Sequence, residues 1–145
     1  MRLALLVLVL ALVGCAPEKT IEEETFAAAL AVDLSASQKL PSGMYIRDQM
    51  EGGGSIAAQG NTLTMRYTGW LANGTQFDSN QGRGFQFVLG EGVVIQGWDL
   101  GVKGMKTGGK RQLIIPPALG YGASGQGPIP PNAILVFDVT LVSQP

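Results

Sequence analysis

Histidine is absent from this chain of 145 residues. Without an imidazole, the chain cannot form a serine–histidine or cysteine–histidine nucleophilic pair, and it lacks the commonest general base. Histidine is also a frequent ligand of zinc and other transition metals, so most sites of that kind are excluded as well. We therefore expect any chemistry to proceed without imidazole and without a bound cofactor.

Charged residues are scarce too. They make up 14% of the chain, the formal net charge is −1, and there is no run of basic residues. Nucleic acids are bound chiefly through clustered Lys and Arg on their phosphates, so we expect no nucleic-acid partner. Apolar residues make up 46% of the chain, which at this length is enough for one domain with a hydrophobic core.

The chain has one cysteine, Cys15, which therefore has no disulfide partner within the chain. It follows an apolar run from Leu3 to Val13 that begins directly after Arg2. This pattern predicts a signal peptide over residues 1–14. The run is about half of the 20 or so residues that span a bilayer, so a permanent transmembrane helix is disfavoured.

The segment Leu12-Val13-Gly14-Cys15 resembles the bacterial lipobox, in which the cysteine is diacylated and becomes the first residue of the mature chain. The resemblance implies lipidation of Cys15 and a protein tethered to a membrane of the cell envelope, outside the cytoplasm. Its location would be periplasmic or outer-membrane, and the non-acidic Ala16 implies the outer membrane in a double-membraned bacterium. The alternative is a signal peptide that happens to end in cysteine.

Residues 15–42 are expected to form a partly helical linker that carries the lipidated cysteine. Thr20 and Glu23 have the spacing of a capping box, and Phe26, Leu30 and Leu34 would form an apolar stripe on the helix that follows. This helix would pack on the domain, join a partner, or space the domain from the membrane. It is too short for a dimerisation domain of its own, so a monomer is favoured.

Alternating patterns in the rest of the chain predict antiparallel strands. Residues 62–68 alternate strictly between apolar and polar side chains, and Asn73-Gly74 is a strong two-residue hairpin signal. Residues 110–115 and 134–142 are further predicted strands. The sequence therefore predicts an α+β domain with a mostly antiparallel sheet.

One segment of the domain has the period of a helix. Ile95, Trp98, Val102 and Met105 are spaced three, four and three residues apart, which places them on one helical face. The glycines within this segment each lower helix stability by roughly 1 kcal/mol relative to alanine. We therefore expect this helix to be held by packing, in the concave face of the curved sheet. The aromatic residues that would converge there also allow an ordinary aromatic core.

A series of short blocks occurs in fixed order along residues 43–145: Arg66-Tyr67-Thr68-Gly69, Phe77-Asp78-Ser79, Val94-Ile95-Gln96-Gly97-Trp98, Tyr121-Gly122-Ala123 and Ile129-Pro130-Pro131-Asn132-Ala133. On these blocks, residues 43–145 resemble the FKBP-type peptidyl-prolyl cis-trans isomerases. The resemblance implies a curved five- or six-stranded antiparallel sheet wrapped around one short helix. It also implies an isomerase that acts on proline-containing polypeptides, and that macrolides of the rapamycin type bind and inhibit it.

The resemblance further implies which side chains form the pocket: Tyr67, Phe77, Asp78, Phe87, Val94, Ile95, Trp98, Tyr121, Ile129 and Phe137. Such a pocket would work by apolar contact and desolvation of the twisted X-Pro amide rather than by proton transfer. Together with the lipobox, this implies assistance to the folding of secreted or cell-envelope proteins. The alternatives are a tethered module that grips proline-containing segments without catalysis, and a purely structural lipoprotein.

Asp78 allows two interpretations. A carboxylate beside aromatic rings is costly unless it is paired, so Asp78 would either orient Tyr67 or form an ion pair with Arg83. The sequence is compatible with a catalytic role and with a structural role for Asp78.

Overall fold

The computed structural model describes residues 18–145. The predicted signal peptide and Cys15 lie outside the described residues. No helix within residues 18–145 is both long enough and apolar enough to cross a membrane.

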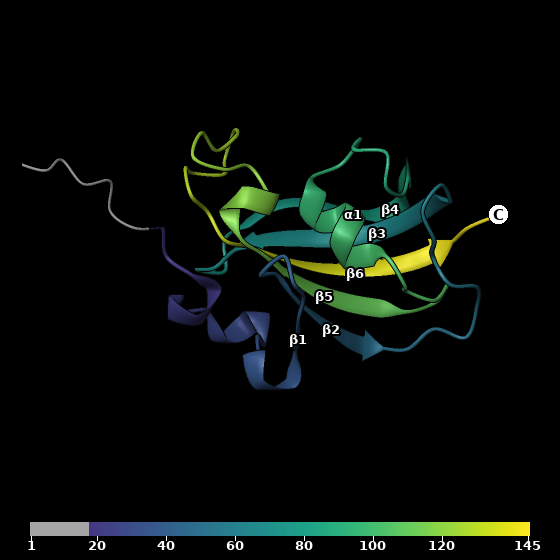
Figure 1. The fold of residues 1–145 in the computed structure, drawn as a ribbon, viewed down its shortest axis with the longest axis horizontal. Coiled ribbons are helices and arrows are strands. Elements are labelled where there is room, and N and C mark those ends of the chain that lie inside the picture. Colours follow the sequence, from purple (N-terminus) through teal and green to yellow (C-terminus); the bar gives the residue numbers. More distant parts are fainter. Residues whose placement is uncertain (1–17) are drawn as a thin grey trace, which may run out of the picture.

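Six antiparallel strands form one curved sheet in the order β1-β2-β5-β6-β3-β4 (Figure 1). The fold is therefore the predicted α+β architecture, with a six-stranded sheet and one short α-helix. The strands are β1 (Gln38–Lys39), β2 (Tyr45–Met50), β3 (Thr62–Leu71), β4 (Gln76–Val88), β5 (Lys110–Ile115) and β6 (Leu135–Ser143).

The predicted hairpin joins β3 to β4 at Asn73-Gly74, where Gly74 has a φ of 91° and its N–H donates to the Leu71 carbonyl. The alternation predicted for residues 62–68 is confirmed, since Leu63 and Met65 are fully buried. Further along the hairpin, Met65 pairs with Phe85 whereas Tyr67 pairs with Asn80. Residues 81–84 of β4 thus lie opposite Arg66 alone, and this bulge bends the strand beside the concave face.

The helix α1 (Gln96–Val102) crosses the concave face of the sheet (Figure 1). Trp98 and Val102 are buried against the strands, as the helical period predicted. Met105 is also buried but follows the helix, which ends at Val102. The helix glycines explain how close it lies: a Cβ on Gly97 would come within 2.5 Å of Ile115.

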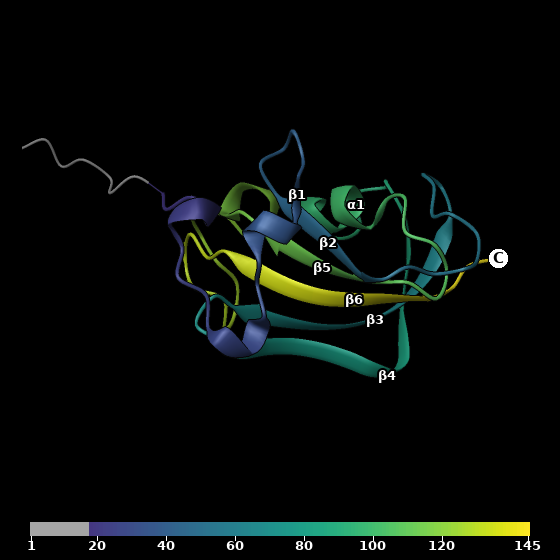
Figure 2. The same cartoon turned by 90° about the horizontal axis from the view of Figure 1, so that it is seen from below.

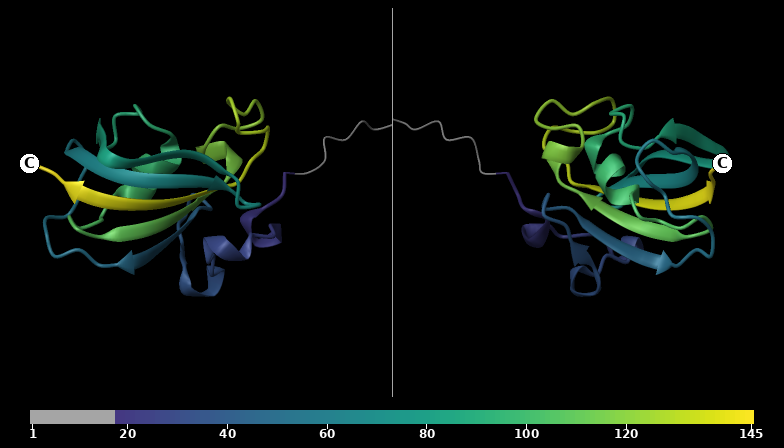
Figure 3. Two further views of the ribbon diagram at one scale, coloured as in Figure 1. Left: turned by 180° about the vertical axis from the view of Figure 1, so that it is seen from behind. Right: turned by 45° about the vertical axis from the view of Figure 1, so that its right-hand side comes forward.

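The prediction of an α-helix after Thr20 is wrong. Three separate 3-10 turns occupy this segment instead, at Ile21–Glu23, Ala28–Leu30 and Leu34–Ala36. Ala31 adopts a left-handed conformation with a φ of 51°, which ends the second turn. The segment follows tertiary contacts rather than its own apolar period: it packs against the convex face of the sheet, opposite α1 (Figure 3).

Candidate functional site

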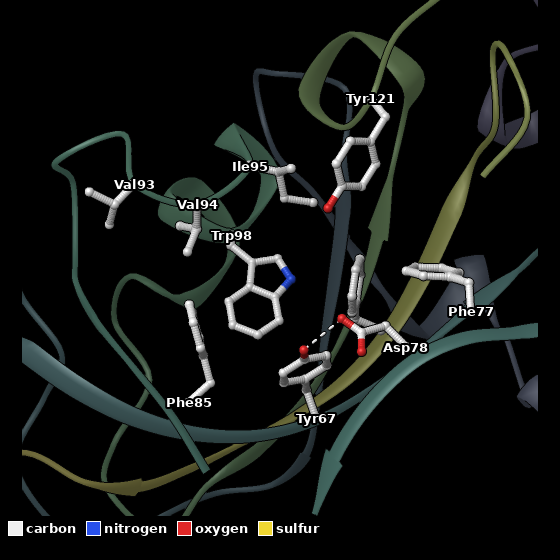
Figure 4. A pocket seen from close by; sticks show the side chains of 10 residues that line it. Tyr67, Phe77, Asp78, Phe85, Val93, Val94, Ile95, Trp98 and Tyr121 are labelled. Carbon is white, nitrogen blue, oxygen red and sulfur yellow. Dashed lines mark hydrogen bonds between the residues drawn. The ribbon is translucent and has the colours of Figure 1, made fainter. Parts of the chain in front are cut away.

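A pocket of about 360 Å³ opens on the concave side of the sheet, beside α1 (Figure 4). Its walls come from β3, β4, β6, α1, and the loops before α1 and after β5. Ten residues line it: Tyr67, Phe77, Asp78, Phe85, Val93, Val94, Ile95, Trp98, Tyr121 and Phe137. Its volume is within the range of small-molecule sites. Seven of the ten lining residues are apolar or indole side chains, and the other three carry a hydroxyl or a carboxylate.

Trp98 lies at the centre of the aromatic lining. Its ring centroid is 5.0 Å from that of Tyr67 and 5.5 Å from that of Phe137, and both pairs meet at an interplanar angle of 85°. Phe77 continues the wall, with its centroid 5.4 Å from that of Phe137. Edge-to-face contacts of this kind are favourable and directional, so the rings hold one another in place.

Gly69 on β3 leaves space for the rings of Phe77 and Phe137. A Cβ at Gly69 would come within 2.7 Å of both the Phe77 ring and the Phe137 ring. The close approach of these rings to the strand therefore depends on the absence of a side chain at this position.

All the predicted site residues line the pocket except Phe87 and Ile129. Phe87 is buried behind Trp98, with the two ring centroids 5.6 Å apart, and Ile129 is 6% exposed and belongs to the hydrophobic core. The structure places Phe85 in the lining instead, 6.2 Å from Trp98 between ring centroids. Val93, which the sequence analysis did not identify, also lines the pocket.

The strand pairing explains why Phe85 rather than Phe87 reaches the pocket. Both residues point to the concave face because they are two apart on β4. Phe85 pairs with Met65, whereas Phe87 pairs with Leu63, one step further from Tyr67. The alternation of the sequence predicts which face of the sheet the two phenylalanines share, but not how far each lies from Tyr67. Only the strand register distinguishes them.

Asp78 pairs with Tyr67. The Tyr67 hydroxyl donates to Asp78 Oδ2 over 2.7 Å, and the Ser79 N–H donates to Asp78 Oδ1 over 2.8 Å. None of the ion pairs within residues 18–145 joins Asp78 to Arg83. The structure thus has the first of the two predicted arrangements, in which the carboxylate orients the tyrosine.

The two tyrosine hydroxyls of the pocket stay protonated at neutral pH. Burial and the hydrogen bond to Asp78 raise the pKa of Tyr67, and burial together with the charge of Asp78 raises the pKa of Tyr121. The Tyr121 hydroxyl points toward the space above Trp98 in Figure 4. It is therefore positioned to donate a hydrogen bond to a bound molecule.

The loop before α1 is held by a side chain of the helix itself. Asp99 accepts hydrogen bonds from the Gly90 N–H over 2.8 Å and from the Gly92 N–H over 3.1 Å. Both glycines have positive φ values, of 86° and 69°, which favours glycine at these positions. Asp99 thereby fixes the loop that presents Val93, Val94 and Ile95 to the pocket.

The pocket offers an apolar enclosure with hydroxyl donors and one carboxylate. Within residues 18–145, no group of three or more Cys, Asp or Glu side chains could hold a metal ion. The lining also lacks a lysine and a cysteine, so it has neither of these common nucleophiles. The lining thus offers apolar contact surface and hydrogen-bonding groups to a bound molecule.

Comparisons with known proteins agree on one family. A family model described as "FKBP-type peptidyl-prolyl cis-trans isomerase" matches residues 53–142. An FK506-binding protein of Neisseria meningitidis serogroup B is 52% identical over 103 residues, which cover 69% of this chain and 94% of that protein. FK506-binding protein 4 of Rhizopus delemar is 53% identical over 107 residues, but the match spans only 28% of its length.

Solved structures show the same likeness. The crystal structure of FkpA from Escherichia coli matches with a TM-score of 0.71 and 35% identity, covering 81% of this chain and 55% of that one. The crystal structure of AtFKBP13 matches with a TM-score of 0.69 and 41% identity, covering 79% of this chain and all of that one. The family model spans every residue that lines the pocket.

Proposed function

This chain belongs to the family of FKBP-type peptidyl-prolyl cis-trans isomerases, and we propose that it accelerates the cis–trans interconversion of X-Pro bonds in polypeptides of the cell envelope. The observation that carries the proposal is the aromatic pocket, which combines an apolar enclosure with tyrosine hydroxyls. Prolyl isomerisation breaks no covalent bond, so it suits a pocket of this composition.

Desolvation and hydrogen bonding supply the proposed rate acceleration. The barrier to rotation about the peptide bond is about 18–20 kcal/mol, and the uncatalysed reaction takes tens to hundreds of seconds. At the transition state the amide is twisted out of conjugation, and its carbonyl oxygen carries less negative charge than in the planar amide. An apolar wall therefore accommodates the twisted amide better than water does. Each tenfold acceleration requires about 1.4 kcal/mol of preferential binding to the transition state.

Each part of the pocket has a proposed role. Trp98 forms the floor under the proline ring, with Phe85 and Val94 at its sides, and the buried Phe87 supports the floor from behind. Phe77 and Phe137, with the Tyr67 ring, form the wall against the twisted carbonyl. The Tyr121 hydroxyl and the Ile95 N–H donate to flanking carbonyls of the substrate. The N–H groups at a helix start lack partners within the helix, which favours this use of Ile95.

We assign Asp78 a positioning role in this scheme. Its carboxylate holds the Tyr67 hydroxyl, so the tyrosine ring faces the pocket at a fixed angle. The core residue Ile129 has a supporting role: its N–H and carbonyl pair with Gln126, which closes the loop that follows Tyr121.

The assay that tests this proposal uses residues 16–145, which retain every described residue. We expect this protein to accelerate the cis-to-trans conversion of a leucine-proline peptide, and rapamycin to abolish the acceleration by filling the pocket. A folded protein without acceleration would contradict the catalytic proposal. Rapamycin binding in that case would instead support the alternative of a module that grips proline-containing segments.

We further propose that residues 1–14 are a signal peptide and that Cys15 carries the lipid. Acyl chains on Cys15 would hold the domain at a membrane surface, where it would meet newly exported polypeptides. Intact mass spectrometry of the mature protein, expressed from its full sequence in a double-membraned bacterium, should show a diacylated N-terminal cysteine. Replacing Cys15 by serine should remove the acyl mass, and an unmodified Cys15 in the original protein would contradict the anchor.

A further inference from the structure

We propose that residues 19–40, here called the strap, are a positioning element of the pocket rather than a spacer alone. The strap crosses the convex face near one end of the sheet (Figure 2). It contacts two segments that lead directly into pocket walls: the turn between β3 and β4, and the start of β6. The inference rests on the proposed function, because it assigns the strap a role in the same reaction.

The strap is packed as part of the domain. Ile21 is 2% exposed and lies in a hydrophobic cluster with Tyr45 of β2, Ile114 of β5 and Ile134. Ile114 faces away from α1, so without the strap its side chain would lie on an open face of the sheet. Burial of apolar side chains at about 25 cal/mol per Å² favours the closed arrangement.

Hydrogen bonds fix where the strap crosses the sheet. Gln112, which is 1% exposed, donates from Nε2 to the Leu30 carbonyl over 2.8 Å. Arg47 donates from its guanidinium to the Ala31 carbonyl over 2.7 Å. The buried Gln112 donor requires a partner, and the half-buried Arg47 adds a second hydrogen bond next to it. These two side chains therefore specify the position of the strap as well as its presence.

The first pocket wall that the strap holds in place is the one that carries Phe77 and Asp78. The Ala27 N–H of the strap donates to the Ala72 carbonyl over 2.8 Å, and Ala72 lies in the turn between β3 and β4. A Cβ at Gly74 would lie 3.0 Å from that of Ala27, which shows how closely the strap lies against this turn. β4 begins two residues after Gly74 and continues into Phe77 and Asp78.

The second braced wall is the loop that carries Tyr121. Ile134, 4% exposed, is covered by the strap cluster and immediately precedes β6. Two residues earlier, the Asn132 N–H donates to the Gly122 carbonyl, next to Tyr121. Fixing Ile134 therefore fixes the end of the loop that holds Tyr121 in place.

In the pocket, Tyr121 and Asp78 lie on the same side of Trp98 (Figure 4). A brace shared by both walls sets their separation, and a small error in such a distance is costly in catalysis. The strap thus positions Asp78 and Tyr121 without touching the substrate.

The replacement of Ala27 by proline tests the brace at a single hydrogen bond. Ala27 has a φ of −59°, which proline adopts without strain, so the substitution removes the N–H that binds Ala72. The matched control is Ala28→Pro. Ala28 is exposed and is the first residue of its 3-10 turn, where proline is tolerated and the N–H has no partner within the turn.

In the full chain, we expect Ala27→Pro to lower kcat/KM by about threefold to tenfold. Ala28→Pro should leave kcat/KM within about twofold of the original value. Amide hydrogen exchange is the readout that a general loss of stability would not reproduce. It should become faster in residues 76–80 and 119–124 of Ala27→Pro but not in the central strand β5.

Each outcome decides the proposal. Equal kcat/KM and equal exchange in the two variants would overturn the brace. Loss of protection throughout the protein, β5 included, would also overturn a positioning role. If Ala27→Pro does not fold, Ile21→Val tests the brace at its packing on Ile134 instead, with the loss of one buried methyl group. An inactive original protein would overturn the proposed function instead, and hydrogen exchange would still decide the brace.

Discussion

Replacing Gly97 by alanine should destabilise the protein, although alanine is the better helix former. Alanine gains about 1 kcal/mol of helix propensity over glycine. The new Cβ, however, would lie 2.5 to 2.9 Å from three side-chain atoms of Ile115, which is fully buried and β-branched. Because Ile115 has no room to move, α1 must shift away from the sheet. We expect a net loss of about 1–2 kcal/mol in the free energy of unfolding.

Chemical denaturation would measure this loss, and the isomerase assay would measure its functional consequence. Trp98 follows Gly97 in α1, so a displaced helix moves the pocket floor and should lower kcat/KM by about tenfold. Gly53→Ala is the control, because a Cβ at Gly53 has no heavy atom within 4 Å. An unchanged or higher stability of Gly97→Ala would show that the helix is not held by this close approach.

The helix illustrates what the sequence could and could not predict. The spacing of Ile95, Trp98 and Val102 correctly predicted a helix whose apolar face meets the sheet. The same sequence made that helix look weak, since its glycines oppose helix formation. In the structure, Gly97 and Gly101 are the contact points with Ile115, Met44 and Leu113. Helix propensity describes an isolated segment, whereas these glycines are required by the close approach of α1 to the neighbouring strand β5.

The pocket was predictable to the extent that short patterns define it. The hairpin at Asn73-Gly74 and the alternation of β3 place Tyr67 opposite the strand that carries Asp78. The choice between Phe85 and Phe87 depends on the bulge at residues 81–84 and on the register with Met65. Val93 was missed because no periodicity in this glycine-rich loop distinguishes it from its neighbour Val94.

The strap is a segment whose structure the local sequence pattern did not predict. Its residues favour helix, and the spacing of Phe26, Leu30 and Leu34 predicted one continuous helix. The structure instead ends a turn at Ala31, where the carbonyls of Leu30 and Ala31 accept hydrogen bonds from Gln112 and Arg47. Those donors lie far along the chain, so no local pattern identifies them. The packing also indicates that a protein starting at Gly43 would lack part of its own fold.

Replacing Trp98 by leucine should have the largest effect on activity. Trp98 is 5% exposed, and its ring contacts Tyr67, Phe85, Phe87 and Phe137. Its indole nitrogen has no hydrogen-bond partner within residues 18–145, so the substitution removes packing alone. We expect a loss of about 2–4 kcal/mol in the free energy of unfolding from the cavity left behind. With the floor lost, kcat/KM should fall by about tenfold to a hundredfold.

Trp70→Leu is the matched control, since Trp70 is the other tryptophan, lies on β3 and does not line the pocket. Both variants should be assayed well below their unfolding temperatures, so that the folded fraction is the same and kcat/KM reports the site alone. Trp70→Leu should then retain the original kcat/KM and rapamycin affinity, whereas Trp98→Leu should lose both. If the folded Trp98→Leu protein kept its activity, the reaction would have to occur outside the pocket of Figure 4. Loss of rapamycin binding with activity intact would separate the macrolide site from the catalytic one.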